Sequence, residues 1–123
     1  MKIIAVDYGE KWTGLAYSPD GVVALPLAVV ITSDLKNQLE GIIGPKGIDQ
    51  LVVGIPLMDN GQKTPITDTI KNFFENNNFK IPVEFINERG STKTALQNSS
   101  GGRADDVAAQ QILTYWLDQQ DAG

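Results

Sequence analysis

Three acidic residues stand where the sequence predicts that a strand ends or a helix begins. Asp7 and Glu88 each follow an apolar run, and Asp105 opens a helical pattern. Carboxylates that meet at the carboxyl ends of neighbouring strands repel one another unless cations lie between them. Two divalent ions about 4 Å apart would relieve that repulsion and form a phosphoryl-transfer site, in which one ion activates water and the other stabilises the leaving oxygen.

Each acid taken alone also has an ordinary structural explanation. Asp7 could bond to the backbone of the glycine turn that follows it, and Glu88 could pair with Arg89 on the surface. Asp105 suits the first turn of a helix, where the helix dipole favours a negative charge. The combination of the three acids, in this order, favours the metal site.

The residue types that are missing from the chain narrow the chemistry further. The 123 residues include no histidine and no cysteine, which excludes an imidazole base, a thiolate nucleophile and a thiolate zinc site. Oxygen ligands instead favour magnesium, manganese or calcium. The net charge of −5 weakly disfavours a nucleic-acid partner, although acids that bind a metal are neutralised by it. No membrane span or secretory signal is predicted, so we expect a cytoplasmic protein.

Apolar patterns predict the elements that would position these acids. The predicted strands are 2–7, 14–17, 22–31, 51–56 and 82–86, and the predicted helices are 34–43, 67 or 68 to 75, 92–97 and 105–117. Pro26 indicates an edge strand or a bulge, and Ser33 and Gly44 are expected to cap and end the first helix. Three strands in a meander, followed by alternating helices and strands, predict a mixed sheet with helices on its faces. We expect one domain over residues 1–123.

Five short motifs resemble those of the YqgF/RuvX family. They are Asp7-Tyr8-Gly9, Gly14-Leu15-Ala16, Val53-Gly54-Ile55-Pro56-Leu57, Asn87-Glu88-Arg89, and Asp105-Asp106-Val107-Ala108-Ala109 followed by Ile112-Leu113. Members of that family are described as Holliday-junction resolvases and as pre-16S rRNA nucleases. The resemblance covers nearly the whole chain. It implies an α/β, ribonuclease H-like fold, in which helices flank a five-stranded sheet made of an antiparallel meander and parallel strands.

The resemblance also implies roles for individual residues. Asp7, Glu88 and Asp105 would be catalytic carboxylates that bind Mg²⁺ or Mn²⁺, in a site that holds two ions. Asp105 is preferred over Asp106 because it shares a helical face with Ala108 and Ala109. The implied substrate contacts are Lys11, Arg89, Thr92 and Arg103.

The chain departs from the family pattern at three places. Asn87 replaces the usual aspartate before Glu88, and Trp12 stands where a basic residue is common. The segment between Glu88 and Asp105 is short and weakly basic, whereas many relatives carry a loop rich in lysine and arginine there. These differences predict weaker contacts to a nucleic-acid backbone.

The resemblance therefore predicts a divalent-metal-dependent nuclease that hydrolyses phosphodiester bonds, with precursor ribosomal RNA as the favoured substrate. A DNA junction resolvase is the second reading and would need two symmetry-related sites, so both monomer and homodimer stay open. A catalytically idle binding protein of the same fold is a third reading. A nucleotide-binding module related to actin-like ATPases is a fourth, although Gly61-Gln62-Lys63-Thr64 misses the P-loop pattern by one residue.

Overall fold

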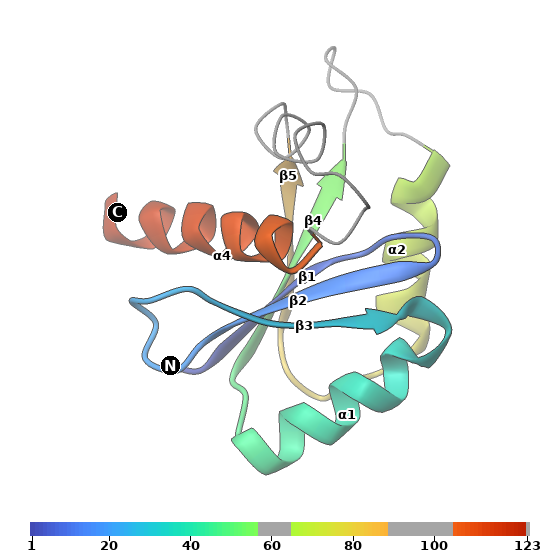
Figure 1. The fold of residues 1–123 in the computed structure, drawn as a ribbon, viewed down its shortest axis with the longest axis horizontal. Coiled ribbons are helices and arrows are strands. Elements are labelled where there is room, and N and C mark those ends of the chain that lie inside the picture. Colours follow the sequence, from blue (N-terminus) through green and yellow to red (C-terminus); the bar gives the residue numbers. More distant parts are fainter. Residues whose placement is uncertain (57–64, 89–104, 123) are drawn as a thin grey trace.

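The computed structural model describes residues 1–56, 65–88 and 105–122, apart from a few side chains that include those of Glu88 and Asp105. Figure 1 shows a central sheet with helices packed on its faces. The strands are β1 (Ile3–Asp7), β2 (Trp12–Ser18), β3 (Leu25–Ile31), β4 (Gln50–Pro56) and β5 (Val83–Glu88), and the helices are α1 (Leu35–Lys46), α2 (Pro65–Asn76) and α4 (Asp105–Ala122). A short 3₁₀ turn, Thr32–Asp34, joins β3 to α1.

The five strands form one mixed sheet in the order β3-β2-β1-β4-β5. The pairs β1/β2 and β2/β3 are antiparallel, whereas β1/β4 and β4/β5 are parallel. The predicted combination of a meander with parallel strands is confirmed. Pro26 lies in the edge strand β3, beside an irregularity in the pairing with β2, as a residue without a backbone N–H requires.

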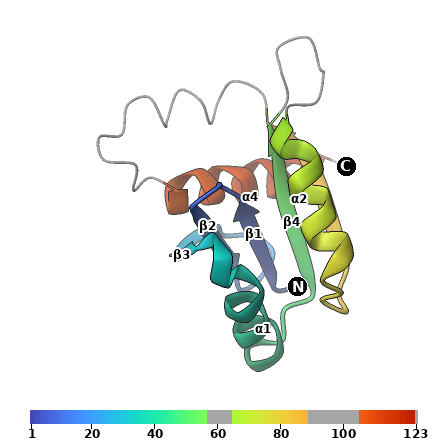
Figure 2. The ribbon, with the colours of Figure 1, turned by 90° about the vertical axis from the view of Figure 1, so that its right-hand side faces the viewer.

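The sheet buries a separate apolar cluster on each face. Alternate residues of β1 divide between them: Ile3 and Ala5 pack with Leu113 of α4, and Ile4 and Val6 pack with side chains of α1 and α2. Figure 2 shows α2 beside β4, on the side of the sheet away from α4. Because β1 and β4 are covered on both faces, their residues are almost wholly apolar.

A side-chain capped turn joins β2 to β3. The Ser18 hydroxyl accepts the Gly21 N–H at 2.9 Å, and the Asp20 carboxylate accepts the N–H groups of Val22 and Val23 at 2.8 and 3.1 Å. The Val23 and Val22 N–H groups lower the pKa of Asp20 below its usual value. Since those two N–H groups bond to Asp20, β3 begins only at Leu25 rather than at the predicted Val22.

Helix α1 differs from its prediction at both ends. Ser33 does not cap it, because the 3₁₀ turn intervenes and Asp34 takes the N-cap position. Pro45 does not end it either, since the helix includes Pro45 and reaches Lys46. A proline at this position removes one backbone hydrogen bond of the helix. The helix ends instead at Gly47, which has φ 65° and suits a left-handed C-cap.

The remaining boundaries shift by a few residues. Helix α2 begins at Pro65, a residue that favours the first helical position, so Thr67 is not its cap; its hydroxyl donates to the Pro56 carbonyl at 3.1 Å. Strand β5 continues to Glu88, and α4 to Ala122. The predicted helix 92–97 lies outside the described residues. None of the helices in the described ranges has the length and apolarity needed to cross a membrane.

Candidate active site

Asp7 is the last residue of β1 and its side chain is partly buried. Side chains alternate between the two faces of a strand, and Ile3 and Ala5 face α4. Asp7 therefore belongs to the face of the sheet that α4 covers. It lies at the carboxyl end of a strand that has a parallel neighbour, which is where ligands bind in open α/β sheets.

The turn after Asp7 is tight enough to require glycine. A Cβ atom on Gly9 would lie 2.2 Å from the carbonyl oxygen of Trp12, a backbone atom with little freedom to move. The predicted glycine turn is therefore confirmed, and its cause is close approach of the backbone rather than an unusual φ.

A buried pair of threonines fixes this turn from the neighbouring strand connection. Thr32 donates its hydroxyl proton to the Gly9 carbonyl at 2.8 Å and its backbone N–H to the Lys11 carbonyl at 2.9 Å. The Thr13 hydroxyl lies 2.8 Å from the Thr32 hydroxyl. Because a hydroxyl has one proton and Thr32 gives it to Gly9, Thr13 must be the donor in this pair. Two hydrogen bonds in series, from Thr13 to Thr32 and from Thr32 to Gly9, therefore hold the turn that follows Asp7.

The pairing of the strands places Glu88 near the same edge. Val6 is paired with Val53, and the next residue of β4, Gly54, is paired with Ile86. Asp7 is therefore level with Ile86, two strand spacings or about 10 Å away. Ile86 packs against the cluster under α4, and the Trp116 indole of α4 donates to Glu84 at 2.8 Å. Strand alternation predicts that Glu88, two residues beyond Ile86, belongs to this face too.

Helix α4 begins at Asp105 and carries the expected apolar stripe. Ala108, Ala109, Ile112 and Leu113 are each no more than 2% exposed, whereas Val107 is 42% exposed. The predicted face of the helix is confirmed. Position 105 precedes Ala109 by four residues and Ile112 by seven, so helical periodicity places it on the stripe that meets the sheet.

The donors implied at this edge fit a hard divalent cation. Carboxylate oxygens suit magnesium and manganese, and no histidine or cysteine is present to favour a softer metal. Within the described side chains, which do not include those of Glu88 and Asp105, no group of three metal-binding residues was found. The three-carboxylate cluster therefore stays a prediction.

The predicted substrate contacts are less completely described. Lys11 is exposed in the turn after Asp7, where an ammonium group could meet a phosphate. Arg89, Thr92 and Arg103 lie outside the described residues.

A pocket that the sequence did not reveal lies next to Asp7. It has a volume of about 250 Å³ and is lined by Tyr8, Glu10, Pro65, Ile66 and Thr69. Tyr8 faces the side of the sheet opposite Asp7, and its ring lies 5.8 Å from that of Phe73 in α2. The sequence signal for this pocket was an aromatic residue directly after an acid at the end of a strand. Apart from Glu10, the rest of the lining comes from α2, which only the fold brings beside Tyr8.

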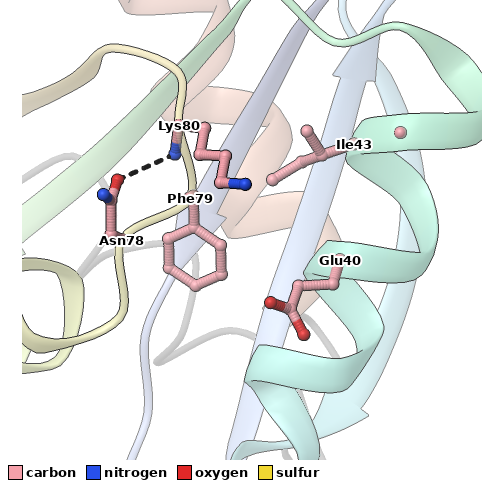
Figure 3. Close-up of a pocket in the computed structure, with 6 residues that line it drawn as sticks. Glu40, Ile43, Asn78, Phe79 and Lys80 are labelled. Carbon is pink, nitrogen blue, oxygen red and sulfur yellow. Dashed lines mark hydrogen bonds between the residues drawn. The ribbon is translucent and has the colours of Figure 1, made fainter.

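A second hollow, of about 210 Å³, lies between α1 and the connection from α2 to β5. Figure 3 shows Glu40 on one side of it and Phe79 and Lys80 on the other. The Asn78 side chain accepts the Lys80 N–H at 3.0 Å and supports its positive φ of 65°. This hollow adjoins the amino-terminal ends of β4 and β5, so it is not part of the site at Asp7.

Comparisons with known proteins agree with this fold. A family model described as "RuvX: Holliday junction resolvase" matches residues 1–119. A protein of Chlorobium chlorochromatii named "Putative pre-16S rRNA nuclease" is 34% identical over 135 residues, which cover 98% of this chain and 96% of the relative. A protein of Lawsonia intracellularis with the same name is 35% identical over 137 residues, covering 99% and 96%.

Solved structures of RuvC share the fold at low sequence identity. Thermus thermophilus RuvC matches with a TM-score of 0.57 and 12% identity, over 99% of this chain and 97% of that one. RuvC from T. thermophilus in complex with a Holliday junction substrate matches with a TM-score of 0.56 and 14% identity, over 99% and 96%.

The fold is therefore ribonuclease H-like, as the resemblance implied. The chain belongs to the RuvX family. It is a member of a nuclease family, which confirms the predicted class of enzyme.

Proposed function

We propose that this protein is a divalent-metal-dependent nuclease whose catalytic carboxylates are Asp7, Glu88 and Asp105. The observation that supports this most directly is the sheet register, which aligns Asp7 with Ile86 on the face covered by α4. Glu88 follows two residues later, and α4 begins at Asp105. In this proposal the three positions, which come from three elements, meet at one edge of the sheet.

In this proposal the three carboxylates hold two Mg²⁺ or Mn²⁺ ions, which would supply an activated water and charge stabilisation for hydrolysis of a phosphodiester. The other residues of the protein would hold these carboxylates in position. Gly9 and Thr32 fix the turn after Asp7, and the packing of α4 fixes position 105. Lys11, which is exposed in the turn, would neutralise a phosphate that lies against it.

We favour precursor ribosomal RNA as the substrate because the relatives named above carry that description. A DNA junction is the second candidate, favoured by the description of the family model. Cleavage of a junction requires two sites related by symmetry, so a dimer in solution would favour it.

The decisive experiment compares the wild type with Asp7→Asn on labelled precursor rRNA and on a four-way DNA junction, each with Mg²⁺, Mn²⁺ or EDTA. We expect metal-dependent cleavage that falls at least a hundredfold in Asp7→Asn, because one ligand charge is removed while the side-chain size is kept. Asp49→Asn is the matched control, since Asp49 is exposed before β4 at the opposite end of the sheet. Full activity in Asp7→Asn, or equal loss in Asp49→Asn, would contradict the proposed site.

A further inference from the structure

The pocket beside Tyr8 has the composition of a site for a flat, uncharged ring. Its lining combines an aromatic ring, two apolar side chains and two polar groups, and it includes no lysine or arginine. Glu10 would repel a phosphate there but can accept N–H groups from the edge of a base. We name the five residues Tyr8, Glu10, Pro65, Ile66 and Thr69 the Tyr8 pocket.

The Tyr8 ring is oriented by its neighbours before any ligand arrives. It lies 5.8 Å from Phe73 at an interplanar angle of 53°, and Phe73 packs in turn on Phe74 at 4.9 Å and 82°. Tyr8 is only partly buried, and it packs against the cluster under α1 and α2. An aromatic ring that is fixed on one side and open to a pocket loses little freedom when a base stacks on it.

The position of the pocket relative to Asp7 suits neighbouring groups of one nucleotide strand. Consecutive Cα atoms are about 3.8 Å apart and consecutive side chains in a strand point to opposite faces. A phosphate on the α4 side of Asp7 would therefore leave an adjacent base free to cross the end of β1 towards α2. A base held in a rigid duplex cannot make that turn, whereas an unpaired base can.

We propose that the Tyr8 pocket binds one unpaired base next to the phosphate that is cleaved, with Tyr8 stacking on the base and Glu10 accepting its N–H groups. This inference rests on the proposed function for the place of the cleaved phosphate. It adds a substrate class: strands that are single or locally unpaired, with bases that carry an exocyclic amino group preferred over uracil and thymine, which offer one imino donor only.

The test uses binding, so that it does not depend on cleavage. The probe is a fluorescein-labelled six-unit tetrahydrofuran–phosphate strand with one central guanine, and the reference is the same strand without a base. Both are titrated against Asp7→Asn protein by fluorescence anisotropy. We expect the guanine to raise the affinity about tenfold, which is the order of one base–aromatic stack.

Three pocket variants and one control, all made in the same Asp7→Asn background, assign that gain to the pocket. Tyr8→Leu should abolish the difference between the two strands, and Tyr8→Phe should keep it, because the ring and its packing on Phe73 remain. Glu10→Ala should lower the preference for guanine over uracil at the same position. Tyr115→Leu, which alters an exposed tyrosine of α4, should change nothing.

The inference is overturned if the guanine strand and the base-free strand bind equally, or if Tyr8→Leu keeps the difference while its circular dichroism matches that of the parent. Failure of the proposed function looks different. A protein that shows the guanine effect but cleaves neither RNA nor a DNA junction would retain the pocket and lose the nuclease assignment. Asp7-dependent cleavage without a guanine effect would retain the nuclease assignment and overturn the base-binding role of the Tyr8 pocket.

Discussion

At the scale of single residues, the site is shaped as much by what surrounds Asp7 as by the acid itself. The backbone after Asp7 approaches so closely that a methyl group on Gly9 has no room beside the Trp12 carbonyl. Consecutive side chains then diverge, Asp7 towards α4 and Tyr8 towards α2. Strand alternation and one glycine thus produce the proposed catalytic face and the Tyr8 pocket from adjacent positions.

Gly9→Ala should destabilise the protein by about 1–3 kcal/mol, the usual cost of forcing an extra methyl group into packed structure. The reason is the 2.2 Å approach to a backbone oxygen, which cannot rotate away as a side chain could. Urea denaturation followed by circular dichroism measures the change. The control is Gly41→Ala in α1, where a Cβ meets nothing within 4 Å; it should stabilise by about 0.5–1 kcal/mol. Equal effects of the two substitutions would contradict the steric explanation.

At the scale of elements, the turn that carries Gly9 is fixed by residues of β2 and of the 3₁₀ turn after β3. Thr13 donates to Thr32, and Thr32 donates to Gly9. Both threonines are buried, so neither hydroxyl can exchange its partner for bulk water. Thr13 only donates in this series, whereas Thr32 both accepts and donates, so the loss of each hydroxyl should change the stability by a different amount.

Thr32→Val should destabilise by about 1–3 kcal/mol, because it leaves the buried Thr13 hydroxyl without an acceptor. Thr13→Val leaves Thr32 bonded to Gly9 and should cost less. The double substitution should cost less than the sum of the single ones, since it removes both hydroxyls of the pair. Urea denaturation of the four proteins measures this coupling, and strictly additive losses would show that the two hydroxyls do not interact.

The same elements show what the sequence could and could not predict. The apolar runs and their order led to the five strands, their antiparallel and parallel pairing, and the buried stripe of α4. Element ends were predicted less well, because they depend on single side-chain bonds and on the backbone conformation of single residues. Asp20 delays the start of β3, and Gly47 rather than Pro45 ends α1. The Tyr8 pocket was missed because it needs α2 beside β1, which no local pattern records.

At the scale of the whole molecule, the distribution of charge constrains how a nucleic acid could be held. The chain has 10 basic and 15 acidic residues, so broad electrostatic attraction to a phosphate backbone is not available. Four of the ten basic residues, Lys63, Arg89, Lys93 and Arg103, fall in segments 57–64 and 89–104, outside the described ranges. Their sequence positions flank β4, β5 and α4. We therefore expect binding to rely on a few phosphate contacts near the proposed site.

A small number of phosphate contacts predicts a shallow salt dependence. For single strands the slope of log K against log salt concentration is about −0.7 per neutralised phosphate. In an Asp7→Asn background, which keeps the RNA intact, Arg103→Gln should lower the steepness of that slope by about 0.7 if Arg103 meets one phosphate. Arg89→Gln should do the same. Lys36→Gln, an exposed position of α1 on the face away from α4, should leave the slope unchanged. Fluorescence anisotropy at several salt concentrations measures all four proteins. A change for Lys36→Gln as large as those for the arginines would mean that RNA is held diffusely over the surface rather than at this edge of the sheet.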